Sequence, residues 1–220
     1  MDVIEGIQTR HSIRAFKDTP IPEETLHKIL KAASLSPSYT NTQPWEVAVV
    51  SGKKKEGLSS IIYDLASNKA EGHPDLPSPQ GWAPEHVARS GEHGARRLAA
   101  LGVQRDDESG REKMALMNYR FYGAPCAIFL FMEGSLNEWS IFDMGLFTQN
   151  LILAAHSLGL ESCLQASVPK YSLEIKQFLG IPEHKKLIIC ISLGYADADA
   201  KLNTYRAIKQ DPEEFTKWFR

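Results

Sequence analysis

Residues 139–158 constrain the fold more than any other part of the chain. They are predicted to form a helix in which nearly every side chain is apolar, and a helix that is hydrophobic all round is buried on all sides. The stretch has the length of a membrane span, but polar and charged residues interrupt it at Asp143, Gln149, Asn150 and His156. A central helix shared between two subunits explains the pattern better.

The other apolar segments do not alternate as cleanly as the strands and helices of a parallel α/β sheet. Apolar residues at helical spacing predict helices at residues 2–8, 23–34, 58–67 and 173–179. Apolar runs predict strands at residues 45–51, 124–133 and 186–193, with a further short strand after Gly159. Residues 51–57 are predicted to form a charged turn with solvated lysines. We expect one α+β domain spanning residues 1–220.

Residues 70–118 lack the strong apolar character of the segments on either side. We expect this stretch to be either a mobile lid or a peripheral helical excursion. His86 and His93 lie seven residues apart on one predicted helix face. Two histidines without a third placed ligand are typical of surface residues, so we predict no metal site. Four aromatic residues near the ends of the stretch either shape a substrate pocket or belong to the core: Trp82, Tyr119, Phe121 and Tyr122.

The formal net charge of the 220-residue chain is -2. Such a balance gives no reason to expect nucleic acid or an anionic membrane as a partner. The N-terminus lacks the basic start and apolar core of a signal peptide, and no uninterrupted apolar stretch suits a membrane span, so we expect a cytoplasmic protein. The three cysteines, Cys126, Cys163 and Cys190, lie among apolar neighbours, which predicts buried, reduced thiols.

An anion site is predicted at residues 10–14, where two guanidinium groups, a hydroxyl and an imidazole occur within five positions. Arg10 and Arg14 each present a fork of donors that fits a phosphate, and the hydroxyl of Ser12 between them supplies a further contact. Taken alone, the segment could equally be a solvated basic turn or a helix N-terminus. A second segment, residues 36–45 (SPSYTNTQPW), leads directly into the apolar run at 47–50. Taken alone, it could be a polar loop that joins a helix to a strand.

In this order and at this distance from the N-terminus, the two segments together resemble the FMN-dependent nitroreductase family. The resemblance covers both ends of the chain and the long apolar helix, and it leaves out residues 70–118. It implies a nitroreductase-like α+β fold, with a central, mostly antiparallel sheet flanked by helices. It also implies a homodimer built on the long helix, with active sites at the subunit interface.

The resemblance assigns cofactor-binding roles residue by residue. The flavin phosphate is assigned to Arg10, Ser12 and Arg14, with His11 adjacent, and to a late arginine, Arg206. A loop contributed by the partner subunit is expected to touch the flavin ring and ribityl chain through Pro37, Ser38, Tyr39 and Asn41. The loop after the long helix is expected to lie against the pyrimidine edge and N5 of the ring through Leu164, Gln165 and Ala166.

Two of these assignments leave alternatives open. Without the resemblance, Arg206 would be an ordinary surface arginine, and Leu164 and Ala166 would be core residues. Many family members carry glutamate or glycine in the loop that here contains Gln165, so the donor to N5 stays open, and a backbone N–H would serve as well as a side chain.

No motif in the sequence indicates another class of chemistry. The chain has no Gly-x-Gly-x-x-Gly or P-loop, no Gly-x-Ser-x-Gly and no His-Glu-x-x-His. A phosphate clamp without visible acid–base residues fits a flavin enzyme, because the cofactor carries the chemistry. The resemblance implies NAD(P)H-dependent reduction of nitroaromatic or quinone-like acceptors by a ping-pong mechanism, with no catalytic side chain named. The alternatives are a flavin enzyme with a non-nitro substrate, such as a dehalogenase-like or dehydrogenase relative, and a flavin-binding carrier or sensor.

Overall fold

The protein is described here by a computed structural model that covers residues 1–104 and 106–220. Its centre is a four-stranded sheet with the order β1-β2-β4-β3. The strands are β1 (Glu46–Ser51), β2 (Cys126–Glu133), β3 (Glu161–Gln165) and β4 (Lys185–Gly194). Each neighbouring pair is antiparallel. This confirms the antiparallel sheet and the strands expected from the apolar runs.

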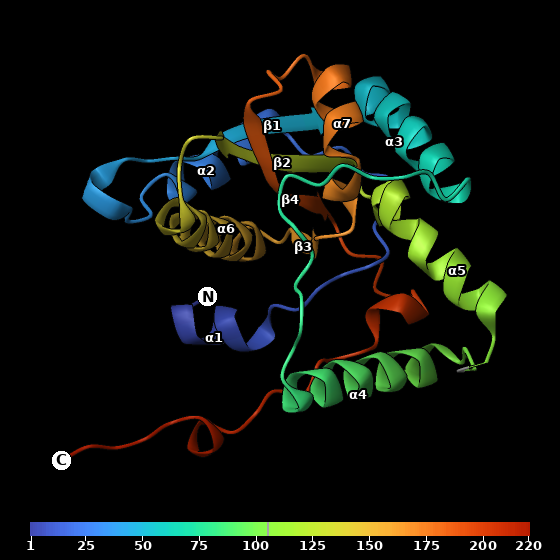
Figure 1. Cartoon of the computed structure of the whole chain (residues 1–220), viewed down its shortest axis with the longest axis vertical. Coiled ribbons are helices and arrows are strands. Elements are labelled where there is room, and N and C mark those ends of the chain that lie inside the picture. Colours follow the sequence, from blue (N-terminus) through green and yellow to red (C-terminus); the bar gives the residue numbers. More distant parts are fainter. Residues whose placement is uncertain (105) are drawn as a thin grey trace.

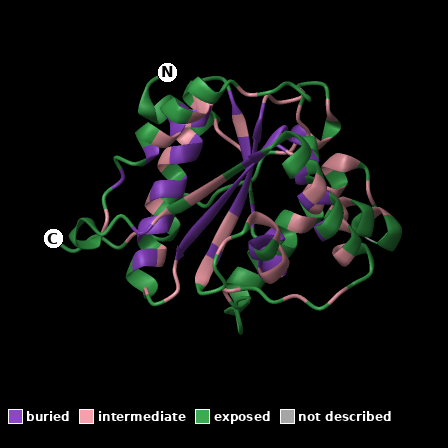
Figure 2. Cartoon of the chain, turned by 90° about the horizontal axis from the view of Figure 1, so that it is seen from above, coloured by how far each residue is buried: buried purple, intermediate pink, exposed green. Residues whose placement is uncertain are grey.

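Strand β2 carries the core because its side chains alternate between the two faces of the sheet. Cys126, Ile128, Leu130 and Met132 pack with one helical layer, whereas Ala127, Phe129 and Phe131 pack with the other. All seven of these residues are buried, as the continuous apolar run predicted. Figure 2 shows the strands as a buried layer between helices. The fold therefore has three layers, helix–sheet–helix (Figure 1).

The first helical layer consists of α2 (Glu23–Ala33) and α6 (Glu138–Ser157). Met144, Phe147 and Leu151 of α6 are buried against the sheet. The opposite side of α6 faces away from the chain, with Trp139 62% and Phe142 63% exposed. Among the described residues, α6 is therefore buried mainly on the side that faces the sheet, and the side that carries Trp139 and Phe142 is left exposed.

The second helical layer consists of α3 (Gly52–Ser67) and α7 (Ser172–Leu179). The expected charged turn at residues 51–57 was wrong, because α3 begins at Gly52 and already includes the lysines. Lys55 is buried, and its ammonium group donates to the backbone oxygen of Ala124 at 2.7 Å and pairs with Glu56 at 2.8 Å. Its long apolar stem lets a lysine pack in this way while the charged head keeps its partners.

Three further helices lie outside these layers (Figure 1). They are α1 (Val3–Thr9), α4 (Pro84–Leu101) and α5 (Glu108–Leu116). The last two occupy the segment predicted to be a lid or a helical excursion, and neither contains a buried residue among those described. Near the ends of that segment, Phe121 and Tyr122 belong to the core, whereas Trp82 is half exposed. No helix in the described part of the chain is both long and apolar enough to cross a membrane.

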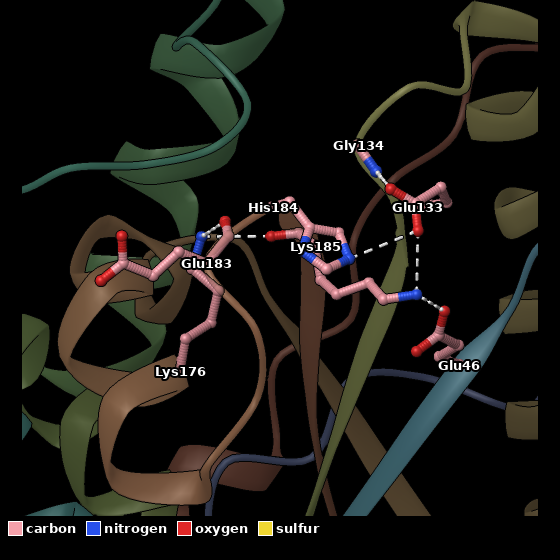
Figure 3. Close-up of polar contacts among 7 residues, drawn as sticks. All are labelled: Glu46, Glu133, Gly134, Lys176, Glu183, His184 and Lys185. Carbon is pink, nitrogen blue, oxygen red and sulfur yellow. Dashed lines mark hydrogen bonds and ion pairs between the residues drawn. The ribbon is translucent and has the colours of Figure 1, made fainter.

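A polar cluster closes one end of the sheet (Figure 3). Lys185 at the start of β4 donates to Glu46 of β1 and to Glu133 of β2, so one ammonium group joins three strands. The donation from Lys185 holds the pKa of the Glu133 carboxyl below its ordinary value. Lys176 of α7 donates to the backbone oxygens of Glu183 and Lys185, both at 3.1 Å. Beyond the opposite end of β4, the backbone oxygen of Tyr195 accepts from the N–H of Lys17 at 2.9 Å, which brings the N-terminal part of the chain to that end of the sheet.

Candidate functional site: a basic cavity between the two ends of the chain

Four of the five residues of the N-terminal motif meet the C-terminal segment around one cavity of about 890 Å³. Arg10, His11, Ser12, Arg14 and Arg206 all line it. The remaining lining residues come from α1, α4 and the C-terminal segment: Ile7, Gln8, Thr9, His93, Tyr205, Ala207 and Lys209. The fold thus brings the first predicted segment and the late arginine together, although most of the chain separates them.

The edge of the sheet fixes the position of the N-terminal motif. Ser12 pairs with Ser162 of β3 as a parallel bridge, and the N–H of Ile13 donates to the oxygen of Ser162 at 3.0 Å. Because side chains alternate along extended chain, Ile13 is buried in the core while Ser12 and Arg14 reach the cavity. Strand-like pairing at the sheet edge therefore sets the direction of the cavity-lining side chains.

Asn203, which sequence reasoning missed, holds the two ends of the chain together. Its side-chain oxygen accepts from the backbone N–H groups of Arg14 and Ala15, at 2.7 and 3.1 Å. Its amide nitrogen donates to the oxygens of Ala15 and Asp197, both at 2.8 Å. The guanidinium of Arg206 donates to the backbone oxygen of Asn203 at 2.6 Å. The buried side-chain amide of Asn203 therefore fixes the backbone at Arg14, and the main-chain oxygen of the same residue fixes Arg206.

The cavity is electrically unbalanced. No carboxylate lines it, and among the described residues Arg10, Arg14 and Arg206 form no ion pair. His11 uses Nδ1 on the backbone oxygen of Thr9 at 3.0 Å, while its Nε2 is buried without a hydrogen-bond partner. Arg10 and Arg14 are half-buried rather than fully solvated. Converging guanidinium groups with a hydroxyl between them form a site for an anion such as a phosphate.

The second predicted segment lies elsewhere in the same chain. Pro37, Ser38, Tyr39 and Asn41 are not among the residues that line the basic cavity. The N–H of Tyr39 donates to Asp143 of α6 at 3.1 Å, and its ring stacks on Trp139 with centroids 5.9 Å apart. Nearby, Asn150 of α6 donates to the hydroxyl of Ser36 at 2.7 Å.

The loop is thus fastened to α6. Within it, Thr40, Asn41 and Gln43 adopt positive φ, and Ser38 accepts from the N–H of Gln43 at 3.0 Å. Tyr39 is largely exposed. The loop therefore presents its side chains outward from the uncovered side of α6.

The third predicted segment lies at the end of β3 and not in a loop as expected, because Leu164 and Gln165 are the last two residues of that strand and only Ala166 follows it. Gln165 is 1% exposed, and its amide donates to the backbone oxygen of Asn118 at 2.7 Å and accepts from the hydroxyl of Ser192. Leu164 and Ala166 are exposed, so the alternative that they are core residues was wrong. Ala166 lines a different cavity, together with Tyr119. The Gln165 side chain is engaged inside the protein, which leaves the neighbouring positions to face a ligand.

The remaining polar candidates are structural or peripheral. His86 lies on the surface beside Glu85, with 3.6 Å between ring nitrogen and carboxylate. No group of three or more potential metal ligands occurs within residues 1–104 and 106–220. The three cysteines are free and buried, as predicted, and burial raises the pKa of the Cys126 thiol to about 12. These thiols are therefore held in the protonated, unreactive form.

Comparison with known proteins gives one consistent family. The chain matches the model of the nitroreductase family over residues 7–195. A 4-nitrobenzoate reductase of Pseudomonas putida is 32% identical over 210 residues, which are 96% of this chain and 92% of the relative. Nitroreductase NfnB of Mycolicibacterium smegmatis is 35% identical over 215 residues, 97% of this chain and 91% of the relative.

Solved structures give the same result. The FMN-dependent nitroreductase NfnB from Mycobacterium smegmatis, in complex with NADPH, superimposes with a TM-score of 0.94 at 33% identity, covering 100% of both chains. The FMN and NADPH-dependent nitroreductase NfnB from sphigopyxis sp. strain HMH superimposes with a TM-score of 0.96 at 28% identity, again covering 100% of both chains.

Proposed function

The chain belongs to the nitroreductase family, and from this premise we propose that it is an FMN-dependent oxidoreductase. NAD(P)H is the proposed electron donor, and nitroaromatic or quinone-like compounds are the proposed acceptors. The observation that carries the proposal is the convergence of Arg10, Ser12, Arg14 and Arg206 on one cavity without a carboxylate. The relatives support it, since they are named for reduction of 4-nitrobenzoate and for use of FMN and NADPH.

The residues present fit the phosphate of FMN. Three guanidinium groups supply charge-assisted donors, and the Ser12 hydroxyl supplies a further donor. A phosphate oxygen would also give the buried Nε2 of His11 the hydrogen-bond partner that it does not have within the described residues. When bound, the flavin ring supplies the hydride and electron chemistry, and the protein supplies binding and orientation. Because donor and acceptor would use one site in turn, we propose a ping-pong order.

Residues 164–166, at the end of β3, are proposed to lie against the ring. The side chain of Gln165 is committed to Asn118 and Ser192, so a backbone group of this segment is the proposed donor to N5. No side chain is assigned a catalytic role.

We propose a homodimer in which the loop at residues 36–45 reaches the cavity of the second subunit. The loop and the basic cavity are separate in one chain, so a partner is needed to join them. Large exposed apolar side chains are typical of protein interfaces. They occur on α1, on α6 and on the C-terminal segment, which extends away from the body in Figure 1: Val3, Ile4, Ile7, Trp139, Phe142, Ile208, Phe215, Trp218 and Phe219. An obligate interface of this kind would bury about 2,000 Å² or more.

Two further points remain proposals. We propose that the chain is one domain in which α4 and α5 form a lid beside the cavity, supported by the lack of buried residues in both helices and by His93 at the cavity wall. We propose a cytoplasmic location, supported by three buried free thiols, which are typical of reducing compartments.

The proposed function is tested by the absorbance spectrum of the purified protein and by chromatography of the flavin released on heating. We expect FMN, reduction of the bound flavin by NAD(P)H in a single turnover, and reoxidation by 4-nitrobenzoate. A colourless protein that does not take up FMN, or release of FAD, would overturn the cofactor assignment. Very slow reduction by both NADH and NADPH would favour the carrier or sensor alternative over an enzyme.

A further inference from the structure

Helix α4 brings His93 to the wall of the basic cavity, and Arg97 follows about one turn further along the same helix. His93 and Arg97 are four residues apart and so lie on the same face of the helix. His93 lines the basic cavity. Its Nδ1 contacts the hydroxyl of Tyr205 at 3.1 Å, and the two rings meet edge-on with centroids 5.3 Å apart. The Nε2 atom of His93 forms no hydrogen bond with any described residue and is free to meet a ligand.

Arg97 adds an uncompensated charge beside the motif. The side chain is half-buried, and its Nε is buried without a hydrogen-bond partner. Its charge acts on the same groups as that of Arg14, namely Tyr122, Cys163 and His93. Neither guanidinium forms an ion pair with a described residue. Like charges held together at a partly buried position are unfavourable unless an anion lies between or beside them.

Apolar packing does not explain why α4 lies where it does. The helix has no buried residue among those described, and Figure 1 shows it apart from the sheet, next to the C-terminal segment. Its polar contacts include the one between His93 and Tyr205 and the one between Arg89 and Gln210. An additional attraction to an anion in the cavity would hold the helix in place.

We propose that α4 is part of the phosphate site: His93 contacts the phosphate through Nε2, and Arg97 acts behind it as a positioning charge. The proposal rests on the proposed function, because the anion is the phosphate of FMN. It goes beyond the motif residues by making the lid helix a component of cofactor binding. A bound phosphomonoester then anchors α4 over the cavity, and a flavin without phosphate does not.

The charge of His93 links binding to pH. Without a bound anion, the pKa of His93 lies below its ordinary value. Burial is the largest cause, and the positive charges of Arg97, Arg14 and Lys209 lower the pKa further. The other titratable or charged groups around the cavity are Tyr205, which contacts the ring, His11 and the arginines at 10 and 206. His93 also lines a second cavity, whose further charged residues are Arg89, Glu92, Arg96, Lys209 and Glu214. A phosphate dianion favours the protonated ring and raises its pKa, so binding takes up a proton.

The contribution of His93 to FMN affinity should therefore grow as the pH falls from the pKa of the complex to the lower pKa of the free protein. Protonation of the phosphate itself near pH 6 opposes this trend. The effect of phosphate protonation cancels when the FMN affinity of a His93→Gln variant is compared with that of the parent at each pH, because both proteins bind the same phosphate.

The test measures how strongly the whole protein prefers FMN to riboflavin. Holoprotein is exchanged against mixtures of the two flavins, and the bound fractions give the ratio of their affinities. We expect His93→Gln to lower the ratio about tenfold, as for loss of one charge-assisted hydrogen bond. Arg97→Gln should lower it about fivefold, because this charge acts at longer range.

Arg96→Gln is the matched control. It removes the same charge from the adjacent position of the same helix, but Arg96 is already paired with Glu92 at 2.9 Å and does not line the cavity. Its ratio should equal that of the parent. Hydrogen exchange of residues 84–101 provides a second measurement, and it should be slower with FMN bound than with riboflavin bound.

The outcomes are distinguishable. If Arg97→Gln and His93→Gln keep the parental ratio, α4 is not part of the phosphate site. If both flavins are weakened equally, so that the ratio stays constant, the two residues act only on folding, and the inference is also overturned. A parent protein that shows no preference for FMN would instead overturn the proposed phosphate clamp, and the inference with it.

Discussion

Replacing Asn203 by Ala tests whether one side chain joins the two ends of the chain. The Asn203 amide is buried and makes four hydrogen bonds, to the N–H groups of Arg14 and Ala15 and to the oxygens of Ala15 and Asp197. The substitution removes all four and leaves backbone groups that water reaches only in part. Arg206 donates to the backbone oxygen of residue 203, which the substitution keeps but no longer holds against residues 14 and 15.

The expected loss of stability follows from these contacts. A hydrogen bond within a protein contributes about 0.5–1.5 kcal/mol, and a buried group left unsatisfied costs about 1–3 kcal/mol. Some water entry reduces the penalty, so we expect the free energy of unfolding to fall by about 3 kcal/mol. For a chain of this size, that corresponds to a decrease in Tm of roughly 6–12 °C. The preference for FMN over riboflavin should fall as well, because Arg14 and Arg206 lose their common anchor.

Thermal and urea unfolding, at equal protein concentration and with saturating FMN, measure the effect. Asn68→Ala is the matched control, because Asn68 is exposed and makes one local bond, to the oxygen of Asp64 at 2.9 Å. That control should lose no more than about 1 kcal/mol. If the variant at position 203 is as stable as the control and keeps the parental preference for FMN, the anchoring role is refuted.

Four further predictions each concern the surroundings of a single side chain. Arg14→Ala should weaken FMN binding by about 1.5–3 kcal/mol and leave riboflavin binding almost unchanged; a titration that shows equal losses would exclude a phosphate contact. Phe142→Lys places a charge on the uncovered side of α6 and should yield monomers in sedimentation at micromolar concentration, whereas unchanged dimers would place the interface elsewhere. Asp75→Asn leaves the buried ammonium of Lys176 without its carboxylate, 2.9 Å away, and should cost about 3–5 kcal/mol in urea unfolding; a loss below about 1 kcal/mol would contradict this. Cys126, whose pKa is raised by burial to about 12, should resist iodoacetamide in the native protein at pH 8 and react once the protein is unfolded, so rapid native labelling would show that the thiol is accessible.

Local sequence pattern was sufficient for the strands and for most of the helices that pack on the sheet, but it did not define α4 and α5. The run at 127–132 predicted β2, because a strand buried on both faces needs apolar residues at every position. The start of α3 was missed, because Lys53, Lys54 and Lys55 look like a solvated turn. What makes Lys55 a buried residue is the backbone oxygen of Ala124, which is distant in sequence and leaves no local signal.

The candidate site was predictable to the extent that its residues form a local motif. Arg10, Ser12 and Arg14 occur together in sequence, and their chemistry favours an anion site, although the segment taken alone could equally be a solvated basic turn or a helix N-terminus. Asn203 was not predictable, because an asparagine in a polar C-terminal segment is normally a turn residue. Its role depends on a contact with residues near the other end of the chain, which only the folded structure reveals.

The polar residues of α6 connect the fold to the proposed active site. In the sequence they served only to argue against a membrane span, yet three of them have defined partners. Asp143 accepts from the N–H of Tyr39, and Asn150 donates to the hydroxyl of Ser36. The ring of His156 contacts the hydroxyl of Thr9 at 2.8 Å and the carboxylate of Glu161 at 2.9 Å. They do not leave buried groups unsatisfied. Instead, they fasten the loop at residues 36–45 to the helix and the helix to its neighbours.

This attachment holds the loop on the side of α6 where Trp139 and Phe142 are exposed, and outside the basic cavity of its own chain. The apolar side chains of Trp139 and Phe142 on the helix are exposed. The side chains of the loop point outward and line no part of the basic cavity. A second subunit placed against that side of α6 would answer both needs, because it would cover the apolar residues and bring its own cavity to the loop. For this reason we propose the dimer as a requirement of the proposed active site.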